Sequence, residues 1–209
     1  MTSIITGDII NSRNVDTNIW MSLLKKTFQE IGASPKTWEI FRGDSFQVEI
    51  EQPEHALFFT IKLKAILKQI KNLDVRIGIG IGEKTENYKR ITEGNGEAFT
   101  FSGKAFDTLV KKQNLAVLTN DEKFNTLMNT SLALALLIMD NWTKNSAEFT
   151  VKYLNNKGTT QKILAKELNI SESSASERRK RAGLDEIMQF EKIYRTMVTH
   201  KKINGCYSL

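Results

Sequence analysis

The first 50 residues alternate between the two hydrophobic periods of secondary structure. Residues 3–10 form an apolar run rich in β-branched side chains, which predicts a strand. The apolar positions of residues 20–31 then repeat every three or four residues, as in an amphipathic helix. Residues 37–41 and 46–50 are short strand-like runs, and the turn-rich residues 42–45 between them predict a hairpin.

The same alternation continues to about residue 120. Pro53 suits the first turn of a helix, which we expect to run to about Asn72. Residues 75–81 predict a strand in which isoleucine alternates with glycine, so that one face is nearly bare and another backbone or a ligand is able to approach it. A helix opening near Glu97 and a strand over residues 115–119 follow. The predicted order is βαββαβ, then a helix and a strand.

No strand-like pattern follows residue 120. Residues 124–142 and 146–154 are helical candidates, and residues 155–158 form the clearest break in the chain. We therefore predict an α/β domain over residues 1–120 and a helical domain over residues 121–209, whose helices pack on the first domain because no long linker is visible.

Composition and chemistry narrow the possible functions. The 209 residues are 40% hydrophobic and 26% charged, with no long uncharged apolar run and no leader-like N-terminus; we expect a cytoplasmic protein with no membrane partner. The single cysteine, Cys206, excludes an internal disulfide. Two distant histidines, His55 and His200, give no metal cluster or triad, so any metal would be held by oxygen atoms.

Basic charge is concentrated at one end of the chain. Residues 1–150 contain 18 Lys/Arg and 18 Asp/Glu, whereas the last 59 residues contain 12 and 6, so the net charge of +6 belongs to the C-terminal segment. This distribution indicates an appended module for a polyanion, or a basic solvated helix surface.

Two aspartates are candidates for a metal site. Asp8 and Asp44 each follow a glycine at the edge of a predicted strand, and the βαββ order places their strands side by side. Mg²⁺ or Mn²⁺ is held by oxygen ligands, often one or two carboxylates completed by substrate phosphates. Alternatively, both aspartates simply stabilise turns.

Four segments resemble class III nucleotidyl cyclase domains: residues 5–12, 42–47, 76–82 and 96–99. Together with residues 38–46, 95–99 and the C-terminal half, they make the whole chain resemble the SatD family. The cyclase resemblance implies an α+β, ferredoxin-like βαββαβ fold in the first domain. It also implies metal binding by Asp8 and Asp44, and purine-nucleotide binding by Ile9, Asn11, Ser12 and Glu93.

The chain departs from active cyclases at their catalytic positions. Thr100 and Lys104 stand where cyclases carry the asparagine that positions the ribose and the arginine that meets the transition-state phosphate. Lysine lacks the planar fork of arginine. Ile40 replaces a lysine that recognises the base. We therefore expect a degenerate domain that serves dimerisation or metal-nucleotide sensing rather than efficient catalysis.

Residues 160–183 have the apolar skeleton of a helix-turn-helix and resemble that of sigma factors and response regulators. Asn169 replaces the usual turn glycine, Arg178 replaces a core aliphatic residue, and Ser171 or Ser173 is expected to cap the second helix. The second helix presents candidate DNA contacts: Ser174, Ser176, Glu177, Arg178, Arg179, Lys180 and Arg181.

These patterns support three hypotheses. The first is a SatD-like regulator that binds double-stranded DNA as a homodimer, since one half-site binds weakly. The second is a metal-dependent enzyme that acts on a nucleoside triphosphate at Asp8 and Asp44. The third is an interaction scaffold, in which the three-helix module docks proteins.

Overall fold

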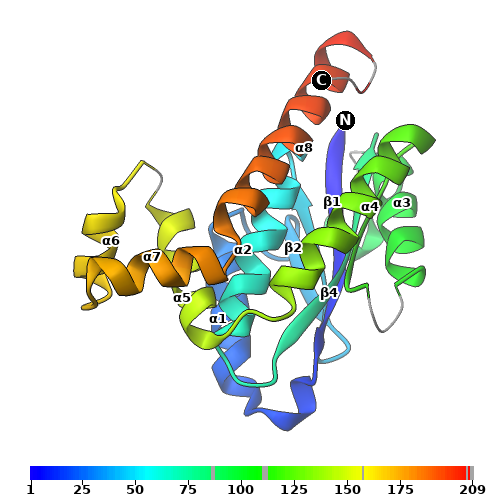
Figure 1. Cartoon of the computed structure of the whole chain (residues 1–209). Helices are drawn as coiled ribbons and strands as arrows, with labels where there is room; N and C mark the ends of the chain where they lie inside the picture. Colours follow the sequence, from blue (N-terminus) through cyan, green and yellow to red (C-terminus); the bar gives the residue numbers. More distant parts are fainter. Residues whose placement is uncertain (86–87, 110–112, 157, 206, 208–209) are drawn as a thin grey trace.

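Within the described residues, five strands form one mixed sheet in the order β2-β3-β1-β4-β5 (Figure 1). The computed structural model describes residues 1–85, 88–109, 113–156, 158–205 and 207, so Cys206 lies outside the described residues. All neighbouring strands are antiparallel except β4 and β5, which are parallel. The strands are β1 (Thr2–Ile10), β2 (Trp38–Phe41), β3 (Ser45–Ile50), β4 (Asp74–Gly82) and β5 (Leu115–Leu118).

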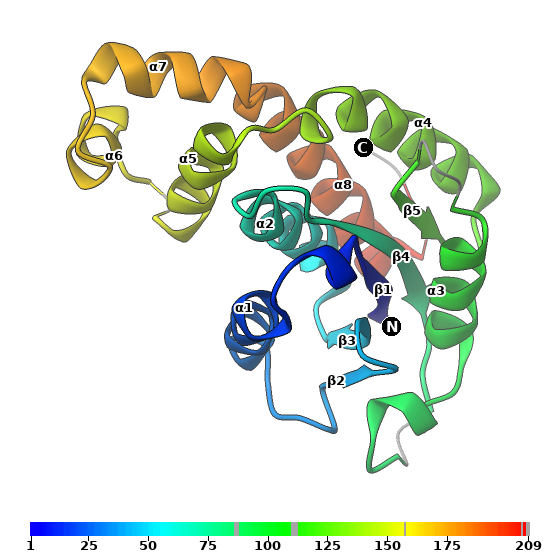
Figure 2. The same ribbon diagram turned by 90° about the horizontal axis from the view of Figure 1, so that it is seen from below.

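The first four strands have the order and directions of a ferredoxin-like βαββαβ unit, which confirms the α+β class. Helices α1 and α2 connect them and cover one face of the sheet, while α3 covers the other (Figure 2). These helices are α1 (Thr17–Gln29), α2 (Ala56–Lys68) and α3 (Glu97–Asp107); short 3-10 turns are η1 (Ser12–Asn14), η2 (Pro53–His55) and η3 (Ile91–Glu93).

The glycine face of β4 exists because the backbone of α3 lies directly on it. A Cβ atom at Gly80 would lie 2.2 Å from the carbonyl oxygen of Ala98 and 2.2 Å from the amide nitrogen of Ser102. The alternating isoleucines of β4 point to the opposite face and are buried in the main core. The bare face predicted from the sequence is therefore occupied by another backbone.

In the described residues after the sheet, the chain forms the helices α4 (Glu122–Met139), α5 (Lys144–Asn155), α6 (Gln161–Glu167), α7 (Glu172–Arg181) and α8 (Leu184–Asn204). One hydrophobic core runs from Ile79 of the sheet to Leu164 of α6 and Ala175 of α7, so the two predicted domains share it. No helix in the described part of the chain is long and apolar enough to cross a membrane.

Two helices differ from the sequence prediction. Helix α2 ends at Lys68 rather than near Asn72, because Asn72 takes a left-handed conformation with φ of 70°. The sequence pattern predicts a helical domain over residues 121–209 but does not predict α8 as a separate helix within it. Its buried face contains Glu191, and this charged residue interrupts the apolar repeat that would have identified the helix.

The free edge of β5 is closed by side chains of α4. The Asn129 side chain accepts a hydrogen bond from the amide of Val117 at 2.9 Å and donates one to its carbonyl at 2.8 Å. Asn125 pairs in the same way with Thr119. These contacts satisfy the backbone groups of an edge strand and oppose the addition of a further strand.

Candidate functional site

Asp8 and Asp44 line the same polar pocket, which has a volume of about 530 Å³. Asp8 lies near the end of β1, directly between Ser45 of β3 and Arg76 of β4. Asp44 precedes β3 in a turn where Arg42 and Gly43 have positive φ angles of 51° and 91°. Sheet pairing therefore brings the two carboxylates to one end of the sheet, as their spacing predicted.

Arg76 forms the centre of this pocket. Its Nε atom donates to Oδ1 of Asp8 at 2.9 Å and its Nη2 atom donates to Oδ2, so the pair is bidentate. The guanidinium also lies over the Phe106 ring of α3, 5.5 Å from its centroid. The hydrogen bonds to Asp8 and the nearby charge of Asp44 raise the pKa of Arg76, although partial burial opposes the change.

The donor set fits a metal ion only in company with a ligand. The described residues contain no cluster of three or more His, Cys, Asp or Glu side chains. Both Asp8 oxygens face Arg76, and Oδ2 of Asp44 accepts the Ser12 hydroxyl at 2.5 Å. Because Mg²⁺ is often held by one or two carboxylates and substrate phosphates, these residues suit a cation that arrives with a nucleotide.

The end of β1 and the turn after it carry three of the predicted nucleotide-binding residues. The side chain of Ile9 is buried in the core, and Ser12 is buried beside Asp44. Asn11 is left-handed with φ of 62°, and its side-chain amide donates to the carbonyl of Asn72 at 2.9 Å. All three line the pocket.

Three predicted residues lie elsewhere in the chain. Thr100 and Lys104 are exposed on α3, and Glu93 is exposed in η3, which contacts β2 and β3. None of the three lines the pocket that contains Asp8 and Asp44.

The pocket is also lined by four residues that the sequence pattern did not predict: Arg76, Arg13, Asn14 and Asn114. Arg76 is identifiable in the sequence as a charged residue within the apolar run of residues 75–81. Arg13, Asn14 and Asn114 are polar residues outside the strands, where polar residues are common, so the sequence does not single them out.

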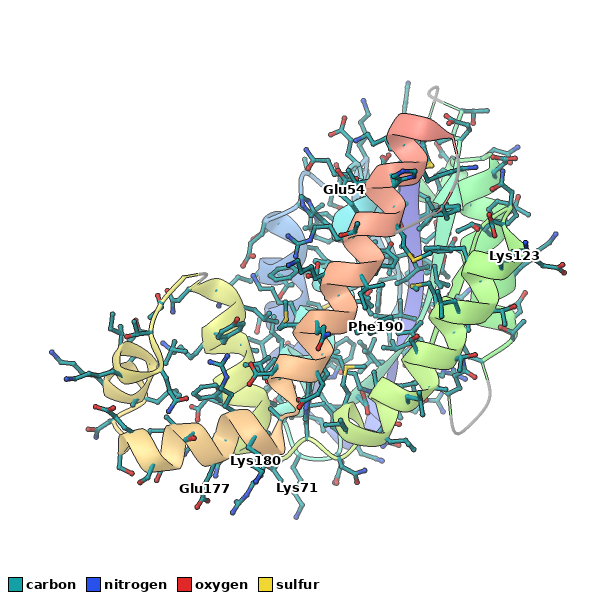
Figure 3. The ribbon with its side chains drawn as sticks, turned by 45° about the horizontal axis from the view of Figure 1, so that its top comes forward. Glu54, Lys71, Lys123, Glu177, Lys180 and Phe190 are labelled. Carbon is teal, nitrogen blue, oxygen red and sulfur yellow. The ribbon has the colours of Figure 1, made fainter. Side chains whose placement is uncertain are left out.

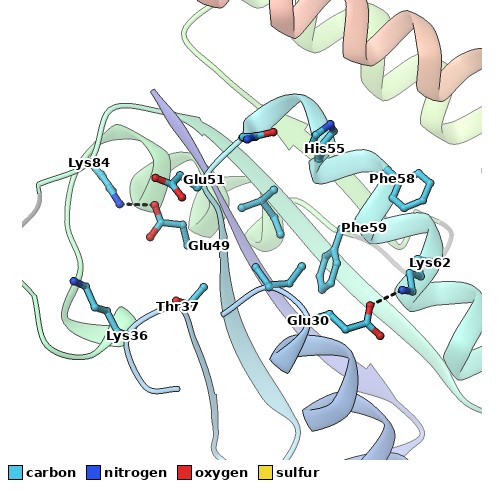
Figure 4. Close-up of a pocket in the computed structure, with 13 residues that line it drawn as sticks. Glu30, Lys36, Thr37, Glu49, Glu51, His55, Phe58, Phe59, Lys62 and Lys84 are labelled. Atoms are coloured by element: carbon cyan, nitrogen blue, oxygen red, sulfur yellow. Dashed lines mark hydrogen bonds and ion pairs between the residues drawn. The ribbon is translucent and has the colours of Figure 1, made fainter. Parts of the chain in front are cut away.

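A larger pocket, of about 660 Å³, lies at the opposite end of β3 (Figure 4). Four of its charged lining residues form two ion pairs: Lys84 contacts Glu49 and Lys62 contacts Glu30, each at 2.6 Å. Burial raises the pKa of Glu49, but hydrogen bonds from Lys84, Thr2 and Tyr88 outweigh this and lower it. The predicted metal and nucleotide residues do not line this pocket, so its size does not make it the candidate site.

Helices α6 and α7 are joined by a tight turn over residues 168–171. Asn169 adopts the left-handed conformation with φ of 52°, as expected for the residue that replaces glycine. The hydroxyl of Ser171, rather than Ser173, caps α7 by accepting the amide of Ser174 at 3.1 Å. Buried Ala165 and Ala175 allow the two helices to pack closely.

Two of the four consecutive cations of α7 are bound within the chain. Arg178 pairs with Glu148 of α5 at 2.9 Å, which explains a charged residue at a core position. Arg179 forms a bidentate pair with Asp185 of α8 and stacks on Tyr153, and hydrogen bonding to Asp185 raises its pKa. These arginines hold α7 against α5 and α8.

The other face of α7 points away from the protein. Its exposed members are Glu172, Ser173, Ser174, Ser176, Glu177, Lys180 and Arg181. Arg181 pairs with Glu177 at 3.0 Å, but both side chains are largely exposed, so the pair is weak and exchangeable. Within the described part of the chain, Lys180 makes no ion pair.

The fold and the pocket define an α+β protein with ferredoxin-like strand order, a polar cleft at one end of its sheet and a C-terminal helical module. A model of the SatD family matches residues 3–198, and the chain therefore belongs to the SatD family. No curated protein matches the chain at a significant level.

Proposed function

We propose that this protein is a regulator that binds double-stranded DNA through α6 and α7, as a helix-turn-helix. The observation that carries the proposal is the exposed face of α7, where Ser173, Ser176 and Lys180 follow helical spacing opposite buried Ala175. In Figure 1, α6 and α7 project from the side of the sheet, so a duplex has access to this face. Serine and glutamate reach base edges, and cations meet phosphates.

Arg178 and Arg179 have a different role in this proposal from Lys180 and Arg181. The first two position the helix through Glu148 and Asp185. The last two remain available for phosphates, because one makes no described ion pair and the other exchanges Glu177 for a phosphate at small cost. The DNA contacts therefore lie on Lys180, Arg181 and the serine and glutamate side chains beside them.

We expect the double variant Lys180→Ala/Arg181→Ala to bind duplex DNA more weakly, by about tenfold per cation at roughly 0.1 M salt. The slope of log affinity against log salt should fall by about one per lost phosphate contact. Fluorescence anisotropy of a labelled duplex, titrated at several salt concentrations, measures both quantities.

The matched control is Lys25→Ala/Lys26→Ala, which removes two exposed cations from α1. It changes the net charge equally and should leave the affinity and the slope nearly unchanged. If both double variants lose the same affinity, the binding is a general charge effect and α7 is not the interface. Wild-type protein that shows no salt-dependent binding would also refute the proposal.

We propose binding of a purine nucleotide with Mg²⁺ or Mn²⁺ as a second function. The supporting observation is that Asp8, Asp44, Arg76 and Arg13 line one polar pocket, so cationic groups for phosphates lie beside carboxylates for a metal. Thr100 and Lys104 do not line this pocket, which favours a sensor over a cyclase within one chain.

Calorimetry with ATP and GTP should show binding that requires Mn²⁺ and that Asp44→Asn abolishes. The amide of asparagine still accepts the Ser12 hydroxyl, so the variant removes the charge and keeps the local hydrogen bond. Asp107→Asn, at an exposed position of α3, is the control. Binding that survives Asp44→Asn would place the nucleotide elsewhere, and a cyclic product would establish an enzyme.

A further inference from the structure

Helix α4 exposes a leucine face that no described element covers. Leu127, Leu134 and Leu137 are 47%, 63% and 70% exposed. No charged residue occurs between Phe124 and Met139, so this solvent-facing surface is uncharged for about 24 Å of helix. Single exposed leucines are ordinary, but three on one uncharged helix face mark an interaction surface.

The spacing of this face is that of a helix–helix seam. Leu127, Thr130, Leu134, Leu137 and Asn141 are separated alternately by three and four residues, which is the heptad pattern of helices that pack along their length. A seam of this kind is self-complementary, because the same residues meet when a twofold axis relates two copies.

We propose that α4 pairs with α4 of a second copy in antiparallel orientation, to form a homodimer. A twofold axis near Leu132 sets Thr130 opposite the partner's Leu134 and Leu127 opposite the partner's Leu137. This arrangement covers each exposed leucine with apolar or uncharged side chains.

Charge selects the antiparallel direction. Lys123 is exposed at the N-terminal end of α4 and points outward from it (Figure 3). A cation is unfavourable near the N-terminus of its own helix and favourable near the C-terminus of another. Antiparallel pairing places Lys123 at the C-terminal end of the partner's α4, whereas parallel pairing would oppose the two Lys123 side chains.

A groove beside the seam supplies the remaining contact area. A helix face about 24 Å long and about 10 Å wide covers far less than the roughly 800 Å² per partner of a stable interface. Two adjoining pockets, of about 650 and 520 Å³, lie between α3, β5 and α4, and Leu118 and Asn129 line both. Thr130 and Ala133 form the border between groove and leucines, so a partner helix on the seam also covers the groove.

Sedimentation velocity over a range of concentrations tests the dimer. We expect Leu134→Lys to raise the dissociation constant at least about 30-fold, because it removes an apolar anchor near the axis from each copy and places a cation against the partner's Thr130 in a seam without charges. The control is Ile19→Lys, at a 50% exposed isoleucine of α1, which should leave the dimer intact. A monomeric wild-type chain, or a dimer that Leu134→Lys leaves intact, would overturn the proposal.

Cysteine cross-linking tests the orientation. In a Cys206→Ser background, a mixture of Leu127→Cys and Leu137→Cys chains should form a disulfide between the two different chains. Each variant alone should form little disulfide, because the antiparallel register separates identical positions. Disulfides between identical chains would instead indicate parallel pairing and contradict the proposed interface. Neither experiment contains DNA, so failure of the dimer is separate from failure of DNA binding.

Discussion

Replacing Lys64 by alanine should lower the free energy of unfolding by about 3–5 kcal/mol, the range for breaking a buried ion pair on one side. The Lys64 side chain is fully buried. Its Nζ atom donates to Oδ1 of Asp74 at 2.7 Å and lies 2.7 Å from Oδ1 of Asp140, where it makes an ion pair without hydrogen-bond geometry. Without Lys64, the carboxylates of Asp74 and Asp140 would face each other across the space that its side chain had filled.

The remaining cation does not compensate for this loss. Lys68 lies 3.4 Å from Oδ2 of Asp74 but donates only to the backbone carbonyl of Asp140, at 2.6 Å, so the Asp140 carboxylate would lose its ion pair. This ionic cluster joins α2 to the start of β4 and the end of α4. Loss of the Lys64 charge therefore weakens both the contact of α2 with β4 and the contact of α2 with α4.

Urea unfolding, followed by circular dichroism, measures the loss. Lys62→Ala is the matched control on the same helix: Lys62 pairs with Glu30, which is 52% exposed, and such a pair contributes about 1 kcal/mol or less. Lys64→Met keeps the length of the buried stem and separates lost charge from lost packing. An equal, small effect of Lys64→Ala and Lys62→Ala would show that the cluster does not stabilise the fold.

The second large effect is expected at Gly80. Gly80→Ala should destabilise the protein by about 3 kcal/mol, because the new methyl group would overlap backbone atoms of Ala98 and Ser102 at 2.2 Å. A backbone segment does not turn aside as a flexible side chain does, so α3 must move away from β4. The displacement would also disturb the contact of Phe106 with Arg76.

Gly103→Ala is the control within α3 itself. A Cβ atom at Gly103 meets nothing within 4 Å, and alanine favours a helix over glycine by about 0.5–1 kcal/mol. We therefore expect Gly103→Ala to raise the thermal midpoint and Gly80→Ala to lower it. Equal thermal midpoints for the two variants would show that α3 does not pack tightly on the glycine face.

The local structure of this protein is largely predictable from its sequence. The hydrophobic periods predicted the strands and helices α1 to α5, because strand and helix repeats depend on neighbouring residues. The apolar skeleton of a helix-turn-helix predicted α6 and α7. The glycines of β4 predicted a close approach, and the order of strands predicted that Asp8 and Asp44 meet. Asn169 and Ser171 fixed the turn between α6 and α7 through their own conformational preferences.

The tertiary structure decided which groups remain available for chemistry. Arg76 and Asp8 are 68 residues apart, and Arg178 and Glu148 are 30 apart, so spacing along the chain does not reveal these pairs. Of the four consecutive cations, Arg178 and Arg179 hold α7 against its neighbours, whereas Lys180 and Arg181 face solvent.

Helix α4 shows the same division between local and tertiary information. The sequence predicts its helical, apolar character over residues 124–142, but apolar residues occur all around this helix. Packing against β5 and the core buries Leu132 and Leu136 and leaves Leu134 and Leu137 in solvent. Periodicity determined that these residues form a helix. The neighbours that fold against it determined which of its faces remains uncovered, because burial depends on contacts between distant segments.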